Sequence, residues 1–257
     1  MNQIITLISD WRLRDPYVAM LKGEVLKAMP DALILDITHY VDKFNLLQTA
    51  ILMRNSYNSF PEGSIHLILT NMSLNSTFPT VLFSHNGHHF IGEDNGVFHL
   101  MFGNETALKG LKLIDKQENT LTQLIKWLQL VNSNSLDKDH TTDYLQFKRM
   151  LIPPSEHIAD NRQIEGQIIY IDAFNNAVTD IPVKMFHEAV QNRPFIATIQ
   201  SKGTWKITKH YPEYSALESE MYLCDNSLGF IEVATYQSDV AILADLDVAD
   251  KIIIQYE

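Results

Sequence analysis

The chain has 257 residues, 46% of them hydrophobic and 20% charged, which is ordinary for a globular protein with one large core or two modest ones. Its formal net charge of −11 and its scattered lysines and arginines argue against a nucleic-acid partner, because phosphate binding needs a basic surface. A single cysteine, Cys224, excludes an intrachain disulfide, and neither a signal-peptide pattern nor an apolar stretch of about 20 residues occurs, so we expect a soluble, cytoplasmic protein without a membrane partner.

The first 70 residues alternate between strand and helix patterns. Short apolar runs at 3–9, 32–37 and 65–70 predict buried strands. Helical spacing of apolar residues fills the intervals, where Asp15-Pro16 predicts a capped helix start and a second helix is expected at 45–57. This order is typical of a mainly parallel sheet flanked by helices, that is, of an α/β domain.

The rest of the chain changes character twice. Residues 80–102 predict short strands separated by turns at Asn86-Gly87 and Asn95-Gly96, followed by a helix at about 119–130 and a loop with a linker at 132–162. After residue 165 one short helix, 182–191, interrupts a series of expected strands, which are 166–174, 194–200, 229–235, 239–245 and 251–256. We therefore predict an α/β domain at 1–155 and a β-rich domain at 163–257.

Generic functional motifs are absent from the sequence. It contains no GxGxxG, GxxxxGK[ST], HExxH or GxSxG pattern. The ten histidines show no zinc-ligand spacing, and His88-His89 beside an NG turn are expected to be strand and turn residues. Cys224 has no evident partner and is expected to be an inert buried thiol. No metal site is predicted.

Two aspartates follow the first predicted strand. Asp10 ends that strand, and Asp15 lies five residues later, just before the helix. Ligand-binding loops of α/β proteins lie at the carboxyl ends of strands. The pair therefore has two interpretations: both are site residues, or one is a turn residue and the other a helix cap.

Six segments, in order along the chain, resemble one protein family. They are SDxxxxDPYVxxxKG from Ser9, DITH at 36–39 followed by Phe44, FPEGSIHL at 60–67, EDNG at 93–96, IDAFNNAVTDI at 171–181 and NSLGFIEVA at 226–234. In these segments the chain resembles the S-adenosylmethionine hydrolases (hydroxide adenosyltransferases), which are related to the fluorinases and chlorinases.

The resemblance implies a fold, an assembly and a reaction. The implied fold is an α/β domain followed by a mostly β, barrel-like domain, and the implied assembly is a homotrimer with active sites at subunit interfaces. In the implied reaction, water or hydroxide attacks C5′ of S-adenosylmethionine and gives adenosine and methionine. S-adenosylmethionine is the expected small-molecule substrate, and no cofactor is expected besides it.

The resemblance also assigns roles to N-terminal residues. Asp10 matches the aspartate that binds the ribose hydroxyls, which suits a carboxylate that accepts two hydroxyl donors. Phe44 matches the aromatic residue that packs against the nucleoside. Asp15 is a weaker substrate-binding candidate, because helix capping alone explains an aspartate before proline.

In the second domain the match covers both ends of the substrate. Asp172 and Ser227 match positions that hold the amino and carboxylate groups of methionine, and Phe174 and Asn176 match residues around adenine. Asn175 stands where the family has glycine. Asparagine tolerates positive φ better than most residues, so we expect this turn to be kept.

The residues that activate water depart from the family pattern. Asn71 occupies the position of the family aspartate, Phe78 lies at about the position of the arginine, and His140 matches the histidine. We therefore expect a hydrolase with a reduced catalytic set, in which His140, helped by Asp143, activates water and Asn71 binds it. The alternatives are a non-catalytic protein that binds or senses an adenosyl ligand, and a transferase that uses another nucleophile.

Overall fold

The computed structural model describes residues 3–73, 76–103, 108–114, 119–150, 155–214 and 220–257. The chain divides into two compact units, Met1–Leu151 and Ile152–Glu257, and each has its own sheet and core. Among the described residues, no helix is both long and apolar enough to cross a membrane.

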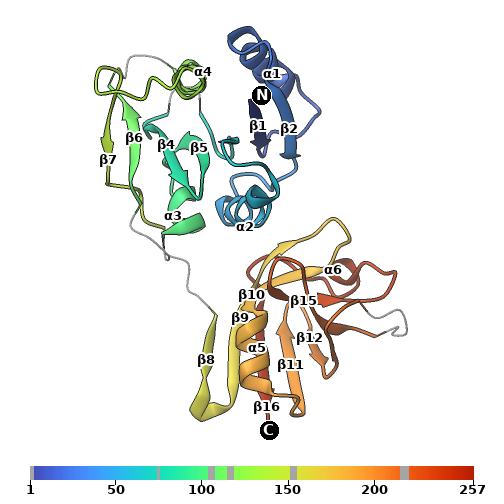
Figure 1. Ribbon diagram of the computed structural model, residues 1–257. Helices are drawn as coiled ribbons and strands as arrows, with labels where there is room; N and C mark the ends of the chain where they lie inside the picture. Colours follow the sequence, from blue (N-terminus) through green and yellow to red (C-terminus); the bar gives the residue numbers. More distant parts are fainter. Residues whose placement is uncertain (1–2, 74–75, 104–107, 115–118, 151–154, 215–219) are drawn as a thin grey trace. The chain divides into compact units, whose positions relative to one another are not determined.

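The first unit is built on a seven-stranded sheet with the order β2-β1-β3-β5-β4-β6-β7 (Figure 1). Strands β2, β1, β3 and β5 are parallel to one another, whereas β4, β6 and β7 extend the sheet in antiparallel pairs. The strand bounds are β1 Ile4–Ile8, β2 Leu33–Thr38, β3 Ile65–Ile68, β4 Thr80–His85, β5 His88–Glu93, β6 Gly110–Leu113 and β7 Thr141–Tyr144. The prediction of an α/β unit with a mainly parallel sheet is confirmed.

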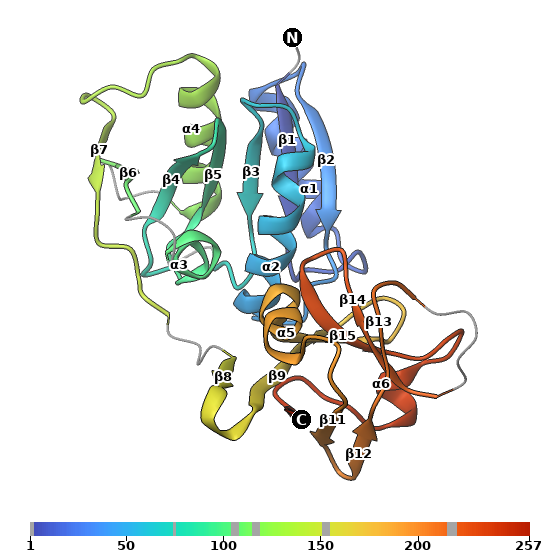
Figure 2. The same ribbon diagram turned by 60° about the horizontal axis from the view of Figure 1, so that its bottom comes forward.

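Helices cover both faces of this sheet (Figure 2). Helices α1 (Tyr17–Ala28) and α4 (Thr120–Asn132) share one apolar core with the sheet, while α2 (Leu46–Ser56) and α3 (Val97–Phe102) share the core on the opposite face. A 3-10 turn, η1 (Tyr57–Ser59), follows α2. The result is a three-layer arrangement that leaves the ends of the strands open to loops.

Local capping explains where several helices begin. The side chain of Asn45 accepts the backbone N–H of Gln48 at the start of α2, and Asn119 caps α4 in the same way. The predicted cap at Asp15 is wrong, because α1 begins at Tyr17 with Pro16 in the cap position and no side-chain bond there. Asp15 lies outside the helix and is exposed.

The two NG sequences adopt different structures. Asn86 and Gly87 have φ values of 46° and 77° and form the predicted hairpin turn between β4 and β5. The predicted turn between strands at Asn95-Gly96 is wrong, because this pair starts helix α3. Gly96 has φ 112°, and the Asn95 side chain accepts the N–H of Val97. The pair thus ends a strand and caps a helix.

The second unit contains a nine-stranded, curled sheet that resembles half of a barrel (Figure 1). The strand order is β12-β11-β16-β9-β10-β15-β14-β13, with β8 paired to β9, and only the β13–β14 pair is parallel. The strand bounds are β8 Glu156–Ile158, β9 Gln163–Ile171, β10 Ala177–Pro182, β11 Phe195–Gln200, β12 Thr204–Ile207, β13 His210–Tyr211, β14 Tyr222–Asp225, β15 Phe230–Ala234 and β16 Lys251–Tyr256. Helices α5 (Val183–Val190) and α6 (Val240–Leu243) pack onto its core, and the short η2 (Ala159–Asn161) precedes β9.

Two expectations for this half of the chain need correction, and a third is confirmed. The predicted strand at 239–245 contains helix α6, since a short apolar run does not distinguish a buried strand from a helix. The predicted loop and linker at 132–162 includes β7 and β8, although residues 151–154 lie outside the described part. The expected inert thiol is confirmed, because burial above all raises the pKa of fully buried Cys224 to about 12.

Candidate functional site

Asp10 connects three segments at the carboxyl edge of the first sheet. It follows β1, and its Oδ2 accepts the backbone N–H of Phe44 at 2.9 Å and that of Asn71 at 3.2 Å. Phe44 lies after β2, and Asn71 lies after β3. Among the described residues no hydrogen bond reaches Oδ1 of this half-buried carboxylate. That oxygen is therefore free to accept hydroxyl donors from a ligand.

Both residues bound by Asp10 have left-handed backbones. Phe44 has φ 64° and Asn71 has φ 55°, and such a conformation is costly for a bulky side chain. The Asp10 carboxylate stabilises both segments through bonds to their N–H groups. The Phe44 side chain is 68% exposed, so one face of its ring is available to a planar ligand.

Buried polar side chains hold the surrounding loops. Asn95 Nδ2 donates to the carbonyl of Thr70, immediately before Asn71, at 3.1 Å. The imidazole of His39 lies between the Ser9 hydroxyl, at 2.7 Å, and Asp36, at 3.1 Å. The sequence segments DITH and EDNG contain His39 and Asn95, but no role for either side chain was inferred from them.

Two buried carboxylates also lie at this edge. Glu93 Oε1 accepts the N–H of Ser73 at 3.2 Å, and Asp94 Oδ2 accepts the Tyr144 hydroxyl at 2.8 Å and the N–H of Lys148 at 2.7 Å. Among the described residues, no hydrogen-bond partner reaches the second, buried oxygen of either carboxylate. Burial raises the pKa of both carboxyl groups.

The structure does not bring His140 to Asp10 within one chain. Ile8 and Thr142 belong to one row of residues across the sheet, five strand spacings apart. Spacings near 4.8 Å place the two ends of that row about 24 Å apart. His140 lies just before β7, and its Nδ1 is 2.7 Å from Asp137 Oδ1, on an exposed surface.

Besides Phe44 and Asn71, the predicted residues of this unit form no hydrogen bond with Asp10 in the described part of the chain. Phe78 carries no charge, but the Lys148 ammonium lies 4.2 Å from the centre of its ring. Asp143 is an exposed residue of β7, and Asp15 is exposed before α1. Of the predicted residues in this unit, the structure therefore brings together Asp10, Phe44 and Asn71.

Asp172 organises a turn in the second unit. It follows β9, and its Oδ1 accepts the N–H groups of Phe174 and Asn176, both at 2.8 Å. Asn175, in the position of the family glycine, has φ 57°, which confirms that asparagine keeps the left-handed turn. The Asn175 side chain donates to Asp239 at 3.0 Å. Phe174 is 76% exposed, so the turn presents an aromatic ring to its surroundings.

A network of polar side chains contacts this turn through Asn176. Asn176 is buried, and its Nδ2 is 3.4 Å from Asp172 Oδ2 and 3.3 Å from the Tyr214 hydroxyl. The Tyr214 hydroxyl donates to Glu232, whose other oxygen accepts Asn226 Nδ2 at 2.9 Å. Burial raises the pKa of Glu232, and the nearby Asp172 carboxylate raises it further.

The network also reaches the turn that carries Ser227. Asn226 Oδ1 accepts the N–H groups of Leu228 and Phe230, which fixes the turn between β14 and β15. Ser227 is exposed on that turn. The segment NSLGFIEVA contains Asn226 and Glu232, but their side-chain pairing and the contribution of Tyr214 depend on contacts that the sequence does not indicate.

Comparisons with known proteins agree across both units. Models of the SAM hydroxide adenosyltransferase N-terminal and C-terminal domains match residues 5–130 and 166–253. An (R)-S-adenosyl-L-methionine hydrolase of Methanocaldococcus jannaschii is 22% identical, over 98% of this chain and 96% of its own length. A protein of the same name from Thermus thermophilus is 26% identical over 37% of each chain.

Solved structures share the fold. An uncharacterized conserved protein of Thermotoga maritima has a TM-score of 0.81 at 18% identity, over 98% of this chain and 99% of its own. A conserved hypothetical protein of Thermus thermophilus has a TM-score of 0.73 at 17% identity, over the whole of both chains. At these identities the likeness concerns the fold.

Proposed function

We propose that this chain, which belongs to the SAM hydroxide adenosyltransferase family, hydrolyses S-adenosylmethionine to adenosine and methionine. The observation that carries the proposal is the geometry of Asp10. One carboxylate oxygen is used by the protein to hold two loops, and the other is left for a ligand beside an exposed aromatic ring. This combination suits a ribose and its attached base.

In this proposal the first unit binds the nucleoside. The Asp10 carboxylate accepts the ribose hydroxyls, and Phe44 packs against the nucleoside face. Asn71, whose backbone N–H is held by Asp10, supplies the side-chain amide that binds the attacking water in this proposal. Asp15 is separate from this group, so its proposed contribution to binding is peripheral.

The second unit supplies the proposed methionine and adenine contacts. Asp172 Oδ2 pairs with the substrate ammonium, while Oδ1 stays committed to the turn. Ser227 hydrogen-bonds the substrate carboxylate, and Phe174 and Asn176 contact adenine. The two partial sites join in a homotrimer, where the first unit of one subunit faces the second unit of its neighbour. Phe44 and Phe174 support this, because both rings are highly exposed in a single chain.

The proposed step is an in-line displacement at C5′. Water or hydroxide forms the C5′–O bond as the bond to the sulfonium sulfur breaks, and the proton of water is given up to a base or to solvent. Methionine leaves as a neutral thioether, so the reaction needs no cofactor besides its substrate. Positioning and exclusion of bulk water supply most of the rate gain.

His140 is the proposed base, and its position sets a condition on that role. It lies about 24 Å along the sheet from Asp10 of its own chain, judged by strand spacing. This role therefore requires His140 to reach the site from another subunit, in addition to the second unit that supplies the methionine and adenine contacts. The replacements at Asn71 and Phe78 favour one alternative function, which is binding of an adenosyl ligand without turnover.

The test is incubation of the purified protein with S-adenosylmethionine, with quantification of adenosine and methionine and calorimetry in the same buffer. We expect the two products in equal amounts, at a rate reduced by Asn71→Ala and removed by His140→Ala, with binding kept. Binding without products would support the alternative function. Absence of both binding and products would overturn the assignment of an adenosyl ligand.

A further inference from the structure

Three side chains from separate segments of the second unit meet at one point. His187 lies on α5, His210 in β13 and Asp225 at the end of β14. His187 Nε2 is 2.8 Å from Asp225 Oδ2, and His210 Nε2 is 2.8 Å from Asp225 Oδ1. In the part of the chain that the structure describes, this is the one group of three such residues whose ligand atoms all lie within 4.8 Å of one another.

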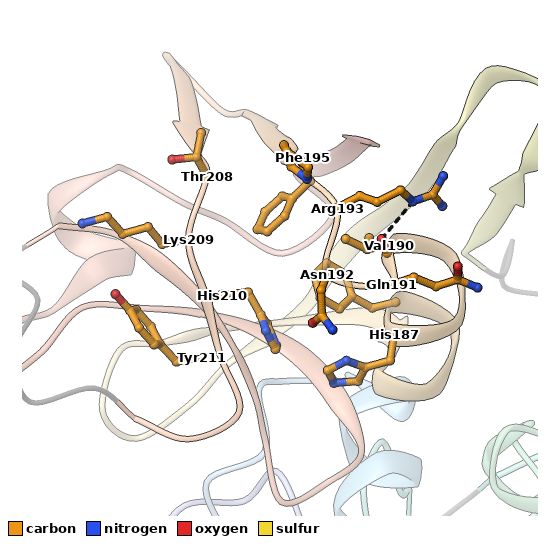
Figure 3. A pocket seen from close by; sticks show the side chains of 12 residues that line it. His187, Val190, Gln191, Asn192, Arg193, Phe195, Thr208, Lys209, His210 and Tyr211 are labelled. Carbon is orange, nitrogen blue, oxygen red and sulfur yellow. Dashed lines mark hydrogen bonds between the residues drawn. The ribbon is translucent and has the colours of Figure 1, made fainter. Parts of the chain in front are cut away.

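The orientation of the two imidazoles is set by packing. The ring of Phe186 lies 4.7 Å from that of His210, and the His187 and His210 rings meet edge to face at 5.2 Å. Figure 3 shows both imidazoles at the lower edge of one pocket, close to each other. A pair of prepositioned nitrogens costs little conformational entropy when a ligand binds.

The donor set is that of a transition-metal ion. Two imidazole nitrogens and one carboxylate oxygen suit Zn²⁺ and similar first-row divalent ions, whereas Mg²⁺ and Ca²⁺ prefer oxygen alone. Tetrahedral zinc with bonds near 2.1 Å separates its ligand atoms by about 3.4 Å. The two 2.8 Å contacts use different oxygens of Asp225. An ion bound by one of these oxygens therefore needs one contact to widen by about 0.6 Å and the second imidazole to turn toward the same oxygen.

The pocket beside the two histidines has room for a ligand of a bound ion. His187 and His210 line a pocket of about 420 Å³, which leaves the fourth metal position open to a water molecule or a small ligand. Two cationic side chains also line the pocket, but both are engaged elsewhere. Arg193 donates to the Val190 carbonyl at 3.1 Å, and Lys209 pairs with Glu220 at 3.4 Å. Figure 3 shows both side chains directed away from the histidines.

We propose that His187, His210 and Asp225 form a binding site for Zn²⁺ or a similar divalent transition-metal ion, with one coordination position open to the pocket. The site is independent of the proposed hydrolase reaction and contributes no atom to it. Asp225 directly precedes the turn that carries Asn226 and Ser227. A bound ion would therefore anchor α5 and β13 to the start of that turn.

The experiment uses the untagged full chain, freed of metal by a chelator. Zn²⁺ is titrated by calorimetry, and Co²⁺ is titrated by its visible absorption, which reports coordination geometry. We expect one ion to bind per chain, and we expect the Co²⁺ spectrum to be typical of a low coordination number. The variants His187→Ala and Asp225→Asn should weaken binding by at least about 10–100-fold, the loss seen when even the partners of metal ligands are removed.

His140 provides a matched control for metal binding. Its side chain is 47% exposed, as is that of His187, and it also contacts one aspartate. Within the described residues it belongs to no group of three metal-ligating side chains. His140→Ala should leave zinc affinity unchanged. Asp225→Asn changes a side chain that contacts two histidines, so a loss of zinc binding in this variant could come from a folding defect. His187→Ala changes a half-exposed helix residue and should fold normally, so it tests zinc binding without that ambiguity. Absence of zinc binding, or zinc binding unchanged in both variants, would overturn the proposal.

Discussion

Each unit of the protein uses one aspartate at a strand end in the same chemical way, but over different ranges of sequence. Asp10 binds the N–H groups of Phe44 and Asn71, which lie 34 and 61 residues further along the chain. Asp172 binds those of Phe174 and Asn176, two and four residues further along. One carboxylate connects three loops of a folded sheet, and the other closes a single turn.

This difference determines what each aspartate can affect. Among the described side chains, only that of Asp10 bonds to the left-handed residues Phe44 and Asn71 together. Removal of this carboxylate would therefore release two loops at once. Asp172 acts within its own turn, which Asn175 and Asp239 also stabilise through a 3.0 Å side-chain bond. The part of the proposed site in the first unit should therefore be sensitive to loss of its aspartate, and the part in the second unit should be less sensitive.

The largest effect is expected for Asp10→Ala. It removes an ionised acceptor from two N–H groups and the proposed ribose contact, so we expect S-adenosylmethionine binding to become undetectable by calorimetry. Bonds to a charged acceptor are worth about 1.5–3 kcal/mol each, so both loops should open more often. Hydrogen exchange of the peptides that contain Phe44 and Asn71 should accelerate.

Asp10→Asn separates the two functions of this carboxylate. The amide oxygen can still accept the two N–H groups, while the amide nitrogen replaces the free oxygen. We expect near-normal exchange protection with strongly reduced binding. Asp15→Ala, in the same loop, should have a smaller effect on affinity than either variant. Unchanged affinity in Asp10→Ala would contradict the ribose assignment.

Smaller effects are expected for the two corresponding substitutions of Asp172, to asparagine and to alanine. Asp172→Asn keeps an acceptor for the turn but removes the charge that faces the substrate ammonium, so affinity should fall by about 10–100-fold with stability unchanged. Asp172→Ala should show the same loss of affinity and a loss of about 1 kcal/mol in the free energy of unfolding, similar to loss of a cap. Calorimetry and urea denaturation measure the two quantities.

The outcome at Asp172 tests the comparison between the units. Exchange protection in Asp172→Ala should be lost only in the peptide that contains Phe174 and Asn176. Loss of protection in strands beyond β9 and β10 would show that this aspartate also has a long-range structural role. The contrast with Asp10 would then disappear.

The sequence was informative about the sheet of the first unit for a physical reason. The buried parallel strands β1 and β3 are continuous apolar runs, and helices α2 and α4 begin at asparagine caps, so pattern and structure agree there. The prediction that the strand at 32–37 is buried is wrong, because β2 is an edge strand without a buried residue. Asn95-Gly96 failed as a predicted turn because the same dipeptide can close a hairpin or start a helix. The choice depends on the 3.1 Å bond from Asn95 to the Thr70 carbonyl, which is a tertiary contact.

The same argument explains what could be predicted of the candidate sites. The turn at Asp172 is local, and both its position and the left-handed Asn175 followed from the segment IDAFNNAVTDI. The histidine cluster could not be predicted, because 23 residues separate His187 from His210 and 15 separate His210 from Asp225. The distance between His140 and Asp10 required the strand order, in which β7 lies at the far edge of the sheet.

The smallest expected effect concerns the backbone of the Asp172 turn. Asn175→Gly and Asn175→Ala both remove the side-chain bond to Asp239, so their difference isolates the cost of φ 57°. A left-handed conformation costs an alanine about 1–2 kcal/mol, while glycine adopts it freely but is more flexible when unfolded. We therefore expect the alanine variant to be about 1 kcal/mol less stable than the glycine variant, measured by urea denaturation. Equal stabilities would mean that the turn rearranges, and affinity for S-adenosylmethionine should then fall in the alanine variant alone.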